Sequence, residues 1–118
     1  PEQLALHLGA ADVCVFPSLF DNFPNACLEA MSAARPIVAT RSGGMEEMLG
    51  EEEAGLLVPP GDAPALAAAI CRLLENPALR TRLALRARAK VLADYAPAVI
   101  GPRHEALYEE AIALRRVA

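Results

Sequence analysis

The sequence has no tryptophan, few other aromatic residues and only three cysteines. Cys14, Cys27 and Cys71 are odd in number and widely spaced, so they provide neither a disulfide framework nor a zinc site made of C-x-x-C pairs. No apolar run approaches the roughly 18 residues of a membrane-spanning helix, and the first residues lack the pattern of a signal peptide. Widely spaced, reduced thiols are typical of a cytosolic protein, and we expect a cytoplasmic location.

A strong charge of either sign is also missing. The net charge of the 118 residues is −4, which gives no indication of nucleic acid or an anionic membrane as a partner. Apolar residues make up 54% of the chain, enough for a real core in one domain or part of one. The opening segment, PEQLALHLGA, is typical of the middle of a longer protein.

Three short apolar runs are present: ADVCVF at 11–16, PIVAT at 36–40 and GLLVP at 55–59. Each is nearly continuous rather than alternating, as in parallel strands that are covered on both faces. A helix is predicted over 24–34, ending at Arg35-Pro36 because a residue before proline disfavours the helical conformation. A short helix follows in GGMEEMLG. The order predicts an α/β fold, a βαβαβ unit with a three-stranded parallel sheet followed by two or three C-terminal helices.

The residues after the third run have helical patterns. Asp62 is the predicted N-cap of a helix over 63–75, and Asn76 caps the next helix, which should run from Pro77 to Asp94. The second of these helices places four apolar residues on one stripe: Leu79, Leu83, Ala87 and Val91.

A basic stripe lies beside that apolar one, at Arg82, Arg86 and Lys90. Such a stripe can bind phosphate or nucleic acid, but a solvated helix face is the interpretation that we prefer. A last helix is predicted within 98–116, and its apolar side carries Leu107, Ala111 and Leu114.

The segment PSLFDNFPN follows the first predicted strand. Ligands of parallel α/β sheets bind beyond the carboxyl ends of the strands, so this segment is in position for one. Pro24 suits a first helical position. The backbone amides of Asn25, Ala26 and Cys27 would then point out of a helix N-terminus, which favours anions such as phosphate.

Glu29 lies about one and a half turns into that helix, between Leu28 and Ala30, and we expect its side chain to be partly buried. A buried carboxylate needs hydrogen bonds, and vicinal hydroxyls of a sugar can donate two. Asp21 could accept hydrogen bonds from a second polyhydroxyl group. The alternative is that Asp21 caps the helix and Glu29 pairs with an arginine, and the spacing alone leaves both open.

Two further patterns have ordinary structural interpretations. Cys27 near a helix N-terminus could be a nucleophile if a histidine partner were near, but a small buried hydrophobic residue is the preferred interpretation. The glycine pair at 43–44 lacks the G-x-G-x-x-G pattern of NAD-binding proteins, and we expect it to form a tight turn. Glu46 and Glu47 are predicted as first-turn acids of the short helix.

The segment SLFDNFPNACLEAMSAARPIVATRSGGMEEML, with AGLLVPPGDAPALAAAICRLL after it, resembles the C-terminal, donor-binding domain of family 4 glycosyltransferases. Those are retaining group 1 enzymes of the GT-B fold, and their signature is an acid, seven residues and a glutamate. The resemblance covers nearly the whole chain. It implies that residues 1–118 are one partial domain, the second half of a Rossmann-like domain that binds a nucleotide-activated sugar.

The resemblance also implies roles for single residues. Glu29 matches the acid that holds the ribose hydroxyls of the nucleotide, and Asp21, in place of the commoner glutamate, matches the acid beside the donor sugar. In the family, one segment lies near the donor sugar and the diphosphate. The residues of this chain that match it are Phe23, Pro24, Asn25, Ala26 and Cys27. No metal and no cofactor are implied, because the nucleotide diphosphate sugar is a substrate. The acceptor is left open.

The family's diphosphate-binding arginine and lysine, and most of its acceptor site, match nothing in these residues. We therefore expect that the chain alone does not catalyse, and that any contact with a membrane surface belongs to the missing domain. An open sheet edge at 11–16 should favour a homodimer or larger assembly of the fragment. Two alternatives stay open: a non-catalytic module that binds a nucleotide or phosphosugar, and a purely structural α/β domain.

Overall fold

The computed structural model describes residues 2–19 and 25–117. Its centre is a three-stranded parallel sheet in the order β1-β2-β3. Two helices connect the strands, as the sequence predicts. The bounds are β1 (Cys14–Phe16), α2 (Asn25–Ser32), β2 (Ile37–Thr40), α3 (Met45–Leu49) and β3 (Leu56–Val58). This confirms the βαβαβ unit, with strands shorter than the apolar runs that predict them.

Helices precede and follow this unit. A helix at the N-terminus, which the sequence analysis did not assign, comes directly before β1. The bounds are α1 (Glu2–Ala10), α4 (Ala63–Glu75), α5 (Pro77–Lys90), the π-helical segment η1 (Val91–Tyr95) and α6 (Pro97–Val117). The predicted helix from Pro77 to Asp94 is therefore two pieces, because the α-helical hydrogen bonding ends at Lys90 and wider π-helical turns continue it.

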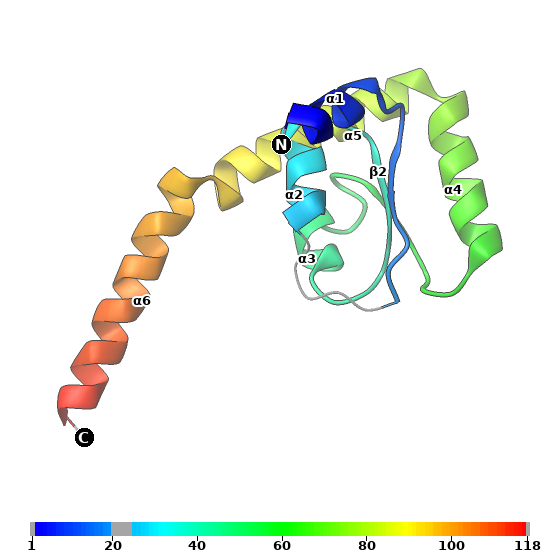
Figure 1. Ribbon diagram of the computed structural model, residues 1–118. Helices are drawn as coiled ribbons and strands as arrows, with labels where there is room; N and C mark the ends of the chain where they lie inside the picture. The colour runs from blue at the N-terminus through cyan, green and yellow to red at the C-terminus, as the bar shows by residue number, and fades with distance from the viewer. Residues whose placement is uncertain (1, 20–24, 118) are drawn as a thin grey trace.

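The sheet separates two apolar layers, which Figure 1 shows as α2 and α3 on one side of β2 and α4 on the other. Along β2, Ile37 and Ala39 join the layer of α2 and α3, and Val38 joins the layer of α4. Along β3, Leu57 joins the first layer, whereas Leu56 and Val58 join the second. This alternation follows from the two-residue period of a strand and explains why the runs are continuously apolar.

Helix α5 contributes to both layers. Leu79 and Leu83 near its start pack in the layer of α4, and Ala87 and Val91 near its end pack in the layer of α2 and α3. All four residues of the predicted apolar stripe are buried, which confirms it. Arg82 and Arg86 on the basic stripe are exposed, as a solvated face requires.

Side-chain caps set the starts of α4 and α5 where the sequence predicts them. The Asp62 carboxylate accepts a hydrogen bond from the Ala65 amide at 2.9 Å, and the Asn76 side chain accepts one from the Leu79 amide at 3.0 Å. Each cap satisfies an amide that has no partner inside its helix.

Helix α2 ends earlier than its predicted limit before Pro36. The amide of Ala34 donates to the Met31 carbonyl, and the amide of Arg35 donates to the Ala30 carbonyl. Ala34 has a φ of 53°, so these bonds form a Schellman motif with alanine where glycine is usual. The helix is closed by this motif, and the proline only follows it.

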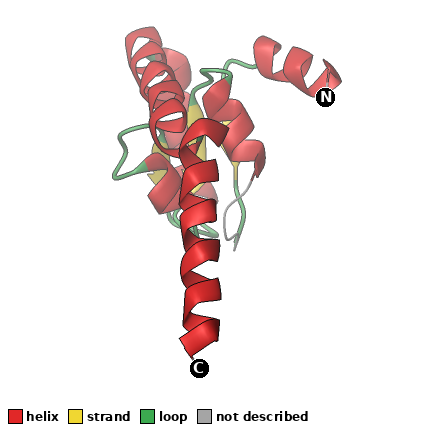
Figure 2. Ribbon diagram, turned by 90° about the vertical axis from the view of Figure 1, so that its left-hand side faces the viewer, coloured by secondary structure: helices red, strands yellow, loops and turns green. Residues whose placement is uncertain are grey.

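Helix α6 extends away from the rest of the molecule (Figures 1 and 2). With this helix included, the molecule measures 58 × 29 × 25 Å along its principal axes. Its expected apolar side is not covered: Leu107 is 60% exposed and Leu114 is 65% exposed. Tyr108 and Ile112 on the same helix are exposed as well. Within residues 2–19 and 25–117, no helix is both long and apolar enough to cross a membrane.

The β1 side of the sheet is also open. All three residues of β1 are only half-buried, and α1 contains no buried residue. In the described part of the chain, β1 pairs with β2 alone, in the register Cys14 to Ile37, Val15 to Val38 and Phe16 to Ala39. The predicted open edge at the first strand is therefore present.

Candidate functional site

The carboxyl ends of the three strands meet at one edge of the sheet, because the strands are parallel. Phe16, Thr40 and Val58 are the last strand residues there. The segment after β1 leads from this edge to the start of α2. Asp21, Phe23 and Pro24 lie outside the described residues, so their predicted roles stay predictions.

The first residues of α2 differ in exposure. Asn25 and Ala26 are exposed at its N-terminus. Cys27 is fully buried in the layer of α2 and α3. This confirms the interpretation of Cys27 as a small core residue, and leaves its backbone amide as the part that suits a ligand.

Glu29 is exposed, and the expectation that it is partly buried was wrong. The buried face of α2 consists of Cys27, Ala30 and Met31, at the spacing of one helix face. Glu29 falls on the opposite side, because a residue two positions after Cys27 is rotated by about 200° around the helix. Its apolar neighbours in sequence therefore do not surround it in space. No arginine of the described residues pairs with it.

Glu29 borders a groove with a volume of about 790 Å³. The groove lies between α1, α2 and η1, and its walls are mainly apolar. The Glu29 carboxylate is thus a charged group at the border of an apolar surface, and nothing in the described chain covers that surface. Other residues that line the groove are Leu4, Leu8, Leu28, Ser32, Leu92 and Tyr95.

Helix α3 begins beside the same sheet edge, through the glycine pair. Gly43 has a φ of 52°, which L-residues rarely adopt, and Gly44 is the N-cap of α3. The predicted tight turn is confirmed. Glu46 and Glu47 are exposed in the first turn of α3, as predicted.

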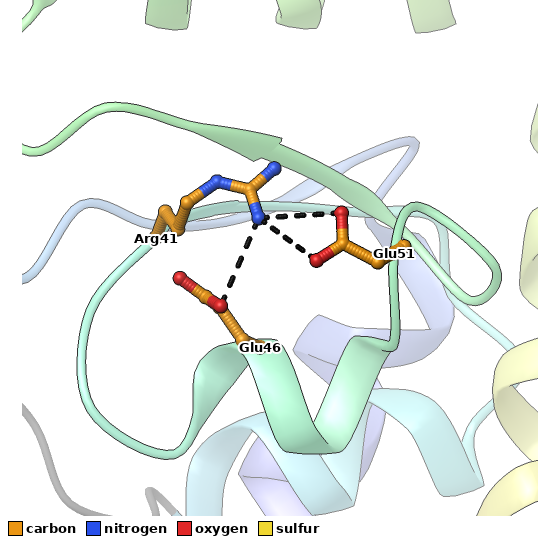
Figure 3. A network of polar contacts seen from close by, with 3 residues as sticks. All are labelled: Arg41, Glu46 and Glu51. Atoms are coloured by element: carbon orange, nitrogen blue, oxygen red, sulfur yellow. Dashed lines mark hydrogen bonds and ion pairs between the residues drawn. The ribbon is translucent and has the colours of Figure 1, made fainter.

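Arg41, the first residue after β2, pairs with two carboxylates near this turn (Figure 3). Its Nη1 lies 3.8 Å from Glu46 and 3.4 Å from Glu51. Both partners are exposed, so the pairs contribute little to stability. They do hold the arginine over the β2–α3 turn.

Thr40 connects two strand ends by its side chain. Its hydroxyl donates to the carbonyl of Ser18, at 2.5 Å, and lies 3.4 Å from the carbonyl of Phe16. The hydroxyl of Ser42 lies 3.3 Å from the same Ser18 carbonyl. Sequence reasoning missed this cluster, because it depends on a backbone carbonyl that the pairing of β1 with β2 brings to the end of β2.

Two titratable groups near the site have shifted pKa values. Burial raises the pKa of the Cys14 thiol, although the nearby Arg35 opposes the shift. Burial also raises the pKa of Tyr95, and the charges of Glu47 and Asp94 add to the effect. Both groups are therefore held in their neutral form, and neither is suited to act as an anion at neutral pH.

Comparison with known proteins identifies the family. Residues 2–76 match the family described as glycosyl transferases group 1. The chain is 36% identical over 113 residues to the MMP alpha-(1->4)-mannosyltransferase of Mycolicibacterium hassiacum, covering 95% of this chain and 28% of that protein. It is 37% identical over 94 residues to the glycogen synthase of Mycobacterium tuberculosis, covering 80% of this chain and 22% of that protein.

Solved structures agree with the sequence matches. A sucrose-phosphate synthase from Thermosynechococcus elongatus has a TM-score of 0.88 and 40% identity, covering 96% of this chain and 28% of that chain. Anabaena HepE in complex with UDP-glucose has a TM-score of 0.83 and 25% identity, covering 90% of this chain and 30% of that chain.

These neighbours are GT-B glycosyltransferases, so the resemblance in the sequence is confirmed. The chain spans only about a quarter of the length of the curated relatives that it matches. Over that length the chain is 31–36% identical to them. The chain belongs to the group 1 glycosyl transferases.

Proposed function

We propose that this chain is the second half of the donor-binding domain of a retaining glycosyltransferase, which transfers a sugar from a nucleotide diphosphate sugar to an acceptor. The observation that carries the proposal is the exposed carboxylate of Glu29 on α2, at the position of the second acid of the family signature. An exposed carboxylate on a helix that starts near the sheet edge is free to receive two hydroxyl groups.

The start of α2 supports the rest of the donor assignment. The exposed residues Asn25 and Ala26 offer backbone amides at a helix N-terminus, where the negative charge of a diphosphate is favoured. The structural neighbour HepE binds UDP-glucose, which makes a nucleotide sugar the first donor class to test. Asp21 is proposed to contact the donor sugar and Glu29 the ribose.

The open side of the molecule supports a partial domain. The groove between α1, α2 and η1 is apolar, and the apolar residues of α6 are exposed. We propose that in the whole protein further chain covers these surfaces and supplies the basic diphosphate contacts and the acceptor site. The whole protein is proposed to be cytoplasmic, and the 118 residues alone to be inactive and to self-associate.

Binding and turnover of the full-length protein that contains this chain would test the proposal. Calorimetry with UDP, GDP and ADP should show micromolar or tighter binding of one of them. Proton NMR of the product formed from the matching sugar nucleotide should show the same anomeric configuration as the donor.

Three results would contradict parts of the proposal. Nucleotide binding without any transfer or hydrolysis of the sugar would favour a binding module. An inverted anomer would contradict the retaining mechanism. Absence of binding for all three nucleotides, with a folded protein, would refute the donor site.

A further inference from the structure

Thr40 is the only buried polar or charged residue in the described part of the chain, with 3% of its surface exposed. It ends β2, whose other residues are Ile37, Val38 and Ala39. A valine at this position would have nearly the same shape and would continue the apolar strand. The hydroxyl is therefore not required to build the sheet, and its contacts indicate another role.

Two of those contacts are with backbone carbonyls at the end of β1 and just beyond it. The Thr40 hydroxyl has one proton, and the Ser18 carbonyl at 2.5 Å is a better acceptor than the Phe16 carbonyl at 3.4 Å. The hydroxyl of Ser42 lies 3.3 Å from the Ser18 carbonyl and 3.3 Å from the Thr40 hydroxyl. Two side chains from the end of β2 thus converge on one carbonyl just beyond β1.

The sheet itself ends before this point. The last residue of β1 in register with β2 is Phe16, opposite Ala39. Pro17 follows and has no amide hydrogen, so it cannot donate to a further ladder bond. The Thr40 hydroxyl donates a hydrogen bond beyond the last ladder pair and fixes the chain at Ser18, two residues after Phe16.

We propose that Thr40, supported by Ser42, is a positioning residue for donor binding. Its hydroxyl fixes the direction in which the chain leaves β1 at Ser18. This inference rests on the proposed function, because the residues proposed to contact the donor follow Ser18 in the sequence. β-Branching makes Thr40 suited to the role, since its side chain has few alternative rotamers in a strand.

The expected effect is on affinity rather than on the chemical step. If the chain at Ser18 is not fixed in advance, ligand binding must supply the ordering, which weakens binding. Thr40 touches no reacting group, so the rate at saturating donor should change little.

The test uses the full-length protein and four variants: Thr40→Val, Thr40→Ser, Ser42→Ala and the control Thr81→Val. Thr81 is exposed on α5, beside the N-terminal end of β2. The substrate is whichever of UDP-, GDP- and ADP-glucose the wild type uses. Thr40→Val should raise the KM for it about 3- to 10-fold, the size expected for the loss of one hydrogen bond. kcat should stay within about twofold.

Thr40→Ser should keep the wild-type KM, because it restores the hydroxyl, and Ser42→Ala should raise KM by about twofold at most. Thr81→Val should have no effect. In parallel, the NMR order parameter of the Leu19 amide should be lower in Thr40→Val than in the wild type, because the chain there is no longer fixed at Ser18. A positioning role predicts both results, whereas a purely structural role predicts neither the KM change at constant kcat nor the rescue by serine.

An unchanged KM in Thr40→Val, or an unchanged order parameter at Leu19, would overturn the inference. A fall in kcat equal to the rise in KM would overturn the positioning role in favour of a direct role in the reaction. If the wild type binds none of the nucleotides, the donor assignment fails first and the functional part of the inference with it. The order parameter would then still decide whether the hydroxyl fixes the chain at Ser18.

Discussion

The sheet has a closed side and an open side. At the closed side, every residue of β2 and β3 is buried, with α4 against one face and α2 and α3 against the other. At the open side, β1 is half-buried and α1 has no buried residue. The groove bordered by Glu29 lies on this open side.

The two sides have similarly apolar sequences and differ in what covers them. The run at 11–16 is as apolar as the run at 36–40, yet only the second has a neighbouring strand on each edge. The comparison indicates a division of roles: closed-side residues determine stability, and open-side residues determine binding and association. The following predictions test that division, from the largest effect to the smallest.

Leu83→Ala should lower the free energy of unfolding by about 2–5 kcal/mol, the usual cost of emptying a buried leucine site. Leu83 is 2% exposed and packs in the closed layer of α4. Leu85→Ala is the matched control, because Leu85 lies on the same helix but is 59% exposed. Urea denaturation should show a change within about 0.5 kcal/mol for the control. Equal losses for the two variants would contradict the assignment of the closed side.

Leu92→Ser should weaken the proposed self-association of the 118-residue chain about tenfold or more, the effect of removing about 1.5–3 kcal/mol of apolar burial. Leu92 lines the groove and is 57% exposed in the single chain. Leu85→Ser, of nearly equal exposure, is the control and should leave association unchanged. Analytical ultracentrifugation at micromolar concentration would measure both. A monomeric wild-type chain would refute the predicted assembly.

Glu29→Gln should weaken binding of the nucleotide diphosphate to the full-length protein about tenfold, with no loss of stability. A charge-assisted pair of hydrogen bonds contributes roughly 1.5–3 kcal/mol, and the lower end applies because an exposed carboxylate must first lose its water. Calorimetry would measure the affinity. Glu75→Gln, exposed at the end of α4, should have the wild-type affinity. If Glu29→Gln also kept that affinity, the ribose role would be excluded.

Chelation of metal ions should have the smallest effect of all. The sequence has no D-x-D-like carboxylate pair at a strand end, so charge stabilisation in the proposed site depends on helix N-termini and on basic residues outside this chain. Activity of the full-length enzyme should therefore survive EDTA. Activity that disappears with EDTA and returns with Mn²⁺ or Mg²⁺ would contradict this prediction.

Local rules predicted most of the closed side. The caps at Asp62 and Asn76 and the apolar stripe of α5 depend on residues near one another in the chain, so the sequence contains the necessary information. The burial of Glu29 was predicted wrongly, because its neighbours in sequence were taken for its neighbours in space. The core contacts of Cys27, Ala30 and Met31 set the rotation of α2 about its axis. This rotation alone decides which face Glu29 occupies.

Tertiary context explains the other differences. Leu107, Ala111 and Leu114 of α6 recur at helical spacing, as the stripe of α5 does, but they meet no layer of this chain, so the pattern does not lead to burial. The cluster of Thr40, Ser42 and Ser18 joins residues from two strand ends, at a sequence separation of more than 20 residues. Such a contact follows from the register of β1 with β2, which the sequence alone did not specify.

The position of α5 has a consequence for synthesis of the protein. Because Leu79 and Leu83 complete one apolar layer and Ala87 and Val91 complete the other, a nascent chain that still holds α5 inside the ribosome exposes both faces of its sheet. The layer of α4 cannot be completed before Leu83 has emerged, and the layer of α2 and α3 cannot be completed before Val91 has emerged. Exposed faces of this kind attract chaperones and promote aggregation. This chain should therefore fold late, after its strands have all been translated.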